Sequence, residues 1–209
     1  MTTSSPQAVA DRLEGLRTRA RTDPSGAQSD TWAWIEQLGE ARNGGELESL
    51  FSNGTVPQGL DGPTDGILVC TLTNPLVDLP VRMLTSAWMP WQGKTFDAAD
   101  AKGINRMTVS SLIPGRILFP LYGMKDAPDD GKLAFDFVTR AEAGAIEPSI
   151  DVLVIDYEPV NENPDLIIRQ IRDELVELVP DTYLGRILFK LPRGGYTNIG
   201  YFALKQPTG

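Results

Sequence analysis

The stretch KLAFDFVTR, residues 132–140, places Leu133, Phe135 and Phe137 at every second position, with smaller or polar residues between them. This period of two predicts a β-strand that has one face on a core and the other nearer to water. Several short β-prone runs of this kind lie between residues 66 and 205, separated by glycine and proline turns. Because they do not alternate regularly with helical segments, they favour an antiparallel sheet that closes into a barrel.

Two helical regions are expected beside the strands. Ser5-Pro6 is typical of a helix start, with serine as N-cap and proline at the first helical position. A second helix is expected from Asp30, so that residues 1–55 form an N-terminal helical extension before a β-barrel domain of residues 56–209. One late helix is expected over DLIIRQIRDELVELV, residues 165–179, because its apolar residues recur at helical spacing. The predicted fold class is mainly β (α+β).

Composition limits the function classes. The 209-residue chain has a formal net charge of −9, which argues against nucleic acid as a partner. It has no histidine and a single cysteine, so we expect no metal site, no cofactor held by such ligands and no internal disulfide. No segment is apolar over the length of a membrane span or a signal peptide, so we expect a cytoplasmic protein without membrane insertion.

The segment WMPWQGKTFD, residues 88–97, concentrates two tryptophans, a glycine and a lysine in an acidic chain. On a regular strand that begins near Trp91, Lys94 and Phe96 share one face and Trp91 lies on the other. Gly93 allows a bulge or a close backbone approach beside the indole ring. The functional interpretation places the Lys94 ammonium at a pocket, and the structural one packs its stem on the barrel with the ammonium in solvent.

This segment resembles the GxWxGK motif of GXWXG-domain proteins, a bacterial group of uncharacterised function. It is more loosely similar to the Gly-x-Trp at the base of lipocalin-type (calycin) β-barrels. Trp91, Gly93 and Lys94 match the motif, and Met89 stands where the motif has its first glycine. The resemblance covers about residues 66–205 and includes IDYEPVNENP, IRDELVELVP, YLGRILF and YFALK. It implies a lipocalin-like barrel in which Trp91 seals one end and the interior holds an apolar small molecule.

The leading functional hypothesis is binding of an apolar or amphipathic small molecule, of lipid, isoprenoid or polyketide type, in the barrel cavity. Such sites are apolar cavities with a few convergent polar groups, and Lys94 or an arginine would anchor a polar head. The candidate ligand-binding residues are Trp91, Lys94, Phe96, Phe119, Phe135, Phe137, Arg172, Tyr183, Tyr201 and Phe202.

The alternative hypothesis is an isomerase, cyclase or hydrolase that uses the same cavity without a cofactor. Asp156 or Lys94 would be the base and a tyrosine the acid. The candidate catalytic residues are Lys94, Asp156, Tyr157 and Tyr201. A carboxylate, Lys94 and a tyrosine that converge inside the cavity would favour this enzyme.

Structural interpretations compete with the catalytic one. Asp156 can instead pair with Arg169 or Arg172 of the expected late helix, and residues 172–174 are typical of a solvated, ion-paired helix turn. A third hypothesis is an interaction module, in which the N-terminal helices or an exposed sheet edge pair two chains as a homodimer.

Overall fold

The structure is a computed structural model that describes residues 4–72, 91–108, 110, 122–127, 131–165 and 167–207. Within these ranges, three α-helices precede the strands, and a 3-10 turn, Ile168–Gln170, comes before β8. The helices are α1 (Pro6–Ala20), α2 (Pro24–Glu40) and α3 (Gly44–Ser52). The strands are β1 (Gly62–Pro63), β2 (Asp65–Thr71), β3 (Trp91–Asp97), β4 (Lys102–Met107), β5 (Lys125–Asp126), β6 (Lys132–Ala143), β7 (Asp151–Asp156), β8 (Ile171–Val179), β9 (Thr182–Lys190) and β10 (Tyr196–Lys205).

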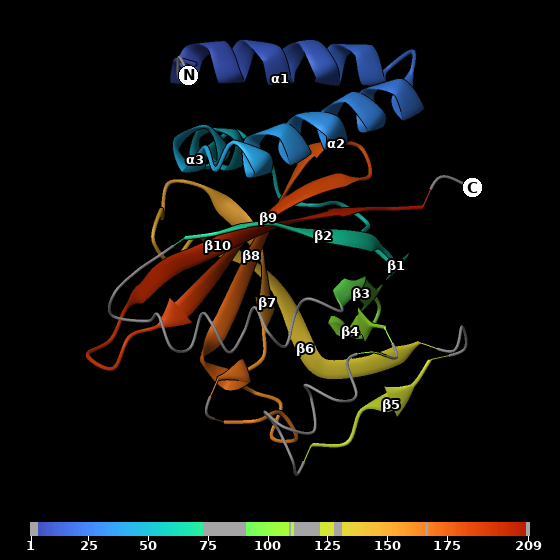
Figure 1. Cartoon of the computed structure of the whole chain (residues 1–209), viewed down its shortest axis with the longest axis vertical. Coiled ribbons are helices and arrows are strands. Elements are labelled where there is room, and N and C mark those ends of the chain that lie inside the picture. Colours follow the sequence, from blue (N-terminus) through green and yellow to red (C-terminus); the bar gives the residue numbers. More distant parts are fainter. Residues whose placement is uncertain are drawn as a thin grey trace.

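All strand pairs are antiparallel, in the order β1-β3-β4-β6-β7-β8-β9-β10-β2, and β5 pairs with β6. The two ends of this order meet at Thr64, which lies between β1 and β2. Its backbone N–H donates to the carbonyl oxygen of Lys94 in β3 at 2.8 Å. The sheet therefore forms a nearly closed barrel (Figure 1), which confirms the predicted antiparallel barrel.

The N-terminal helices begin at serine, aspartate and asparagine caps. The Ser5 side chain accepts a hydrogen bond from the N–H of Ala8, and Pro6 follows it, as predicted. The second helix begins at Pro24 rather than Asp30, because the Asp23 side chain caps it and proline again takes the first position. All three helices lie together on one side of the barrel (Figure 1).

The described residues form two hydrophobic cores, one inside the barrel and one between the helices and the outer face of the barrel. The inner core includes Trp91, Phe96, Phe137, Ile155, Tyr157, Leu175, Tyr183 and Phe202. The outer core includes Leu13, Trp34, Leu47, Phe51, Val152, Val154, Val176, Leu184 and Tyr201. Strands β7 to β10 are thus buried on both faces. The division of the chain into a helical extension, residues 1–55, and a β-barrel domain, residues 56–209, stays a prediction.

The predicted late helix is wrong. Residues 171–179 form β8, which pairs with β7 on one side and β9 on the other. Ile171 and Leu175 point into the barrel, whereas Leu178 packs in the helix-facing core. A strand buried on both faces carries apolar residues on both, and that distribution resembles a helical stripe. The cover expected over β7 comes instead from α1 to α3.

Candidate functional site

A cluster of polar side chains lies inside the barrel, and a bulge in β3 builds it. The pairing of β3 with β4 shifts between Trp91 and Gly93, where Gly93 has φ 142°. A Cβ at Gly93 would lie 2.0 Å from the carbonyl oxygen of Thr64. The extra residue places Trp91 on the same inner face as Lys94 and Phe96. The bulge was predicted, but the assignment of Trp91 to the opposite face is wrong.

Lys94 lies at the centre of this cluster and is fully buried. Its Nζ donates to Asn105 Oδ1 at 2.9 Å, to Tyr157 Oη at 2.5 Å and to Asp173 Oδ2 at 3.1 Å. The Tyr157 hydroxyl in turn donates to Asp173 Oδ2 at 3.0 Å. An amine, a phenol and a carboxylate therefore share one dry hydrogen-bond network.

Asn105 fixes the orientation of this network. Its Oδ1 also accepts from Trp91 Nε1 at 3.1 Å, and its Nδ2 donates to the carbonyl oxygen of Phe135 at 3.0 Å. Phe135 has φ 56°, a conformation that costs a non-glycine residue about 1–3 kcal/mol. The pairing of β4 with β6 shifts across this point. The predicted alternation of residues 132–140 is therefore interrupted at Phe135, where the carbonyl oxygen hydrogen-bonds to the cluster.

Four aromatic rings surround the Lys94 ammonium. Nζ lies 5.6 Å from the ring centroid of Trp91 and 5.2 Å from those of Phe137, Tyr157 and Phe202. Ring faces at this distance attract a cation. Three of the rings rest on glycines, since an added Cβ would contact Trp91 from Gly66, Phe137 from Gly103 and Phe202 from Gly185.

Burial determines the protonation of the cluster. Loss of hydration lowers the pKa of Lys94, and the negative charge of Asp173 opposes that shift. Loss of hydration raises the pKa of Asp173, which the Lys94 ammonium opposes. Burial, and then the Asp173 charge, raises the pKa of Tyr157 well above its ordinary value. These shifts bring the lysine and the carboxylate closer in basicity, so a proton can move between them through Tyr157.

The second oxygen of the Asp173 carboxylate has a different environment. Within the described chain, Oδ1 is buried and has no hydrogen-bond partner. A buried acceptor without a donor costs about 1–3 kcal/mol. Asp173 Oδ1 is thus an acceptor that the described residues leave without a donor.

A cleft of about 690 Å³ opens beside the cluster, between β4, β5, β6 and the segment after β7. This volume lies within the range of about 300–1,000 Å³ that is usual for small-ligand sites. Tyr122, Phe137, Val138 and Val160 form its apolar walls, and charged residues at its edge are Lys102, Lys125, Asp136 and Glu162. Phe137 belongs both to this cleft and to the aromatic rings around Lys94.

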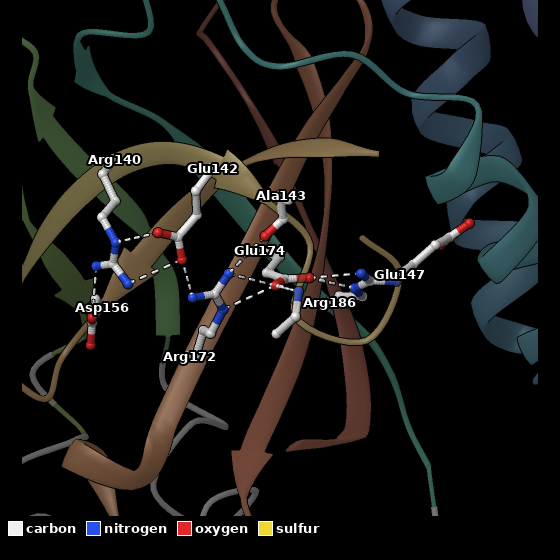
Figure 2. A network of polar contacts seen from close by, with 9 residues as sticks. Arg140, Glu142, Ala143, Glu147, Asp156, Arg172, Glu174 and Arg186 are labelled. Carbon is white, nitrogen blue, oxygen red and sulfur yellow. Dashed lines mark hydrogen bonds and ion pairs between the residues drawn. The ribbon is translucent and has the colours of Figure 1, made fainter. Parts of the chain in front are cut away.

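Asp156 does not join the Lys94 cluster. Its Oδ2 accepts from Arg140 Nη1 at 2.7 Å, and Arg140 Nε also donates to Glu142 Oε2 at 2.9 Å (Figure 2). Glu142 contacts Arg172 as well. The expectation that Asp156 acts as a base in the cavity is therefore wrong. Its predicted partners, Arg169 and Arg172, are also wrong, because β8 is a strand and Arg140 is the residue within reach.

The same network continues across the barrel's outer face to the helices (Figure 2). Glu174 is fully buried between Arg172 and Arg186, with nitrogen–oxygen distances of 2.9 and 2.7 Å. Arg186 pairs with Glu147 at 3.3 Å and lies 4.3 Å from the ring centroid of Phe51 in α3. Residues 172–174 are thus not a solvated helix turn, because Arg172 and Glu174 face outward under cover and Asp173 faces inward.

The structure brings together some of the predicted site residues and separates others. Trp91, Lys94, Phe96, Phe135, Phe137, Tyr157, Tyr183 and Phe202 belong to the barrel interior. Tyr201 packs in the helix-facing core and Arg172 in the outer charge network, so neither lines the interior, and Phe119 lies outside the described residues. Sequence reasoning missed Asn105 and Asp173. Only a period-two interpretation of IRDELV would have placed Asp173 on the inner face.

No protein-family model and no curated protein matches the chain. Among solved structures, the crystal structure of a protein from Thermomonospora curvata is similar, with 18% sequence identity and a TM-score of 0.42. The match covers 83% of this chain and 99% of that chain.

Two absences apply to the part of the chain that the structure describes. No group of three or more cysteine, aspartate or glutamate side chains is arranged to hold a metal ion. No helix there combines the length and the apolar character needed to cross a bilayer.

Proposed function

We propose that the chain binds an apolar or amphipathic small molecule, of lipid, isoprenoid or polyketide type, in the cleft beside Phe137. The observation that carries this proposal is the 690 Å³ cleft, whose walls are aromatic and aliphatic and whose edge is charged. An apolar tail would lie against Phe137, Val138 and Val160. A polar head would meet Lys102 or Lys125 at the edge.

The resemblance of residues 88–97 to the GxWxGK motif supports the same function. In calycin barrels the motif tryptophan seals one end, and Trp91 here is buried and donates to Asn105 inside the barrel.

Thermal unfolding with decanol, decanoic acid and geraniol tests this proposal. A ligand that binds only the folded state stabilises it by about 2.7 kcal/mol at one hundred times its Kd, so at least one compound should raise the melting temperature in a concentration-dependent way. Val160→Arg should abolish the shift because it places a charge on the apolar wall. Ile146→Arg, at an exposed residue that does not line the cleft, is the matched control. If none of the compounds raises the melting temperature, the proposal fails.

A second candidate function is cofactor-independent acid–base catalysis, and the convergence of Lys94, Tyr157 and Asp173 favours it. A lysine of lowered pKa can accept a proton next to a carbonyl group, while a phenol hydrogen-bonds to the developing enolate oxygen. The chain would then be an isomerase or cyclase that uses Lys94 as base and Tyr157 as acid.

Hydrogen–deuterium exchange of methyl octyl ketone in D₂O, followed by NMR, tests this second candidate. The wild-type protein should accelerate exchange next to the carbonyl, and Lys94→Met should remove the acceleration. Lys190→Met, at a residue that pairs with Glu158 and does not line the cleft, should keep it. Equal exchange with and without the protein would argue against catalysis and leave binding as the proposed function.

A further inference from the structure

We propose that Lys94 is a covalent binding site for an aldehyde or ketone with an apolar tail, which it holds as an imine inside the barrel. This inference rests on the proposed binding function and adds the chemical class of the ligand.

The first argument is the cost of the cluster. A buried ion pair usually stabilises a core no better than apolar residues of the same volume, because both charges lose their hydration. Lys94 and Asp173 are both fully buried, and Asp173 Oδ1 lacks a partner within the described chain. Stability alone gives no reason for this pair in the centre of a barrel, whereas loss of hydration is one way in which a lysine amine becomes a nucleophile. A neighbouring carboxylate can take up its proton and return it.

The second argument is the aromatic surround. An imine of Lys94 carries a positive charge when protonated, as the ammonium does. The faces of Trp91, Phe137, Tyr157 and Phe202 at 5.2–5.6 Å attract either cation. The carboxylate of Asp173, 3.1 Å from Nζ, is the counter-ion in both states. The protonated imine therefore has the same charge as the ammonium and meets the same counter-ion and the same rings.

The third argument is that the protons balance within the cluster. A proton passes from Lys94 through the Tyr157 hydroxyl to Asp173, which leaves a neutral amine and a protonated carboxyl. The Nζ lone pair forms a bond to the carbonyl carbon, and a proton moves from nitrogen to the carbonyl oxygen to give a carbinolamine. Asp173 then returns its proton to that hydroxyl group. Water leaves as the carbon–oxygen bond breaks, and a protonated imine remains beside the Asp173 carboxylate.

The fourth argument is the route of entry. Phe137 lines the cleft, and its ring also lies against Tyr157 and Lys94. The ring rests on Gly103, another residue of the cleft, where an added Cβ would lie 2.4 Å from it. Phe137 thus borders both the cleft and the amine. A ligand whose tail fills the cleft reaches Lys94 with its carbonyl carbon when this ring turns aside.

Reductive trapping tests the inference. The folded protein is incubated at pH 7 with decanal and sodium cyanoborohydride, which reduces the imine to a stable secondary amine, and labelled sites are mapped by peptide mass spectrometry. The chain has six lysines, so the other five serve as internal references. Each unit by which a lysine pKa falls raises its neutral fraction about tenfold at this pH. Because burial lowers the pKa of Lys94, it should be labelled faster than Lys102 or Lys125.

Variants and a second ligand give the controls. Lys94→Arg should lose the label at position 94, whereas Lys190→Arg, at a residue that pairs with Glu158 and does not line the cleft, should keep it on Lys94. Phe137→Leu should label Lys94 faster than the wild type. If Lys94→Arg does not fold, the site map of the wild-type protein still decides. Label confined to the other lysines and the N-terminus, with Lys94 modified only in urea, overturns the inference.

Decanol separates the inference from the proposed function, because it has the same tail and cannot form an imine. A rise in melting temperature with decanol together with no label at Lys94 overturns the imine alone. A failure of both overturns binding in the cleft as well.

Discussion

Replacement of Asp173 by asparagine tests whether Lys94 is buried as an ammonium that needs the Asp173 carboxylate as its counter-ion. The substitution keeps the shape of the side chain and removes the only carboxylate that the described residues place against Lys94 Nζ. The ammonium then remains in a dry interior beside two neutral acceptors, Asn105 and Tyr157. Loss of one partner of a buried pair costs about 3–5 kcal/mol.

The loss of stability in Asp173→Asn has an upper limit, because the folded variant can instead release the proton of Lys94. With an unfolded lysine pKa of about 10.4 and about 1.36 kcal/mol for each pH unit, release costs about 4.6 kcal/mol at pH 7 and about 1.9 kcal/mol at pH 9. The folded-state pKa of Lys94 in the variant lies below the unfolded value, so the unfolded state binds the extra proton. Stability of Asp173→Asn relative to wild type should therefore rise with pH over this range.

Urea unfolding at 25 °C, from pH 7 to pH 9, measures this difference. The double variant Lys94→Met/Asp173→Asn removes both charges and should recover most of the stability and lose the pH dependence. Asp165→Asn, which removes an exposed partner of Arg169, should leave stability unchanged. Two results would refute the dependence of the buried Lys94 ammonium on Asp173. One is a loss of stability in Asp173→Asn that stays constant with pH, and the other is a double variant as unstable as the single one.

Two further predictions concern the frame of the site. Gly93→Ala should destabilise the fold by at least about 2 kcal/mol in urea unfolding, because its φ is 142° and the added Cβ meets the Thr64 carbonyl oxygen. The control Gly15→Ala, at an exposed helix position with nothing within 4 Å, should instead stabilise the fold by about 0.5–1 kcal/mol. Equal effects of the two substitutions would contradict the close approach at Gly93. Glu142→Gln should lower stability at neutral pH, because hydrogen bonds from Arg140 and then Arg172 lower the pKa of Glu142. A lowered carboxyl pKa stabilises the folded state at pH values above the unfolded pKa, and the effect is lost as pH falls through the folded-state pKa. Acid titration of the wild type and Glu142→Gln should therefore show their unfolding free energies converge below about pH 4. A difference that persists there would count against the ion pairs.

Local signals in the sequence determined the class of the fold and part of the site. Ser5-Pro6 specifies a helix start, because a hydroxyl acceptor followed by proline satisfies the first turn whatever surrounds it. Alternation of apolar residues specifies strands in the same local way, and Gly93 marks a bulge because only glycine accepts that close approach. These local signals predicted the antiparallel barrel and indicated Lys94 as the polar residue of greatest interest.

The tertiary structure alone decided which residues meet Lys94. Residues 171–179 satisfy both a helical and a strand period, and pairing between β7 and β9 selects the strand that turns Asp173 inward. The bulge at Gly93 changes the phase by one residue and moves Trp91 to the inner face. Asn105 lies in β4, Tyr157 directly after β7 and Asp173 in β8. Their convergence depends on strand order and register, which arise from packing over the whole barrel rather than from any local pattern.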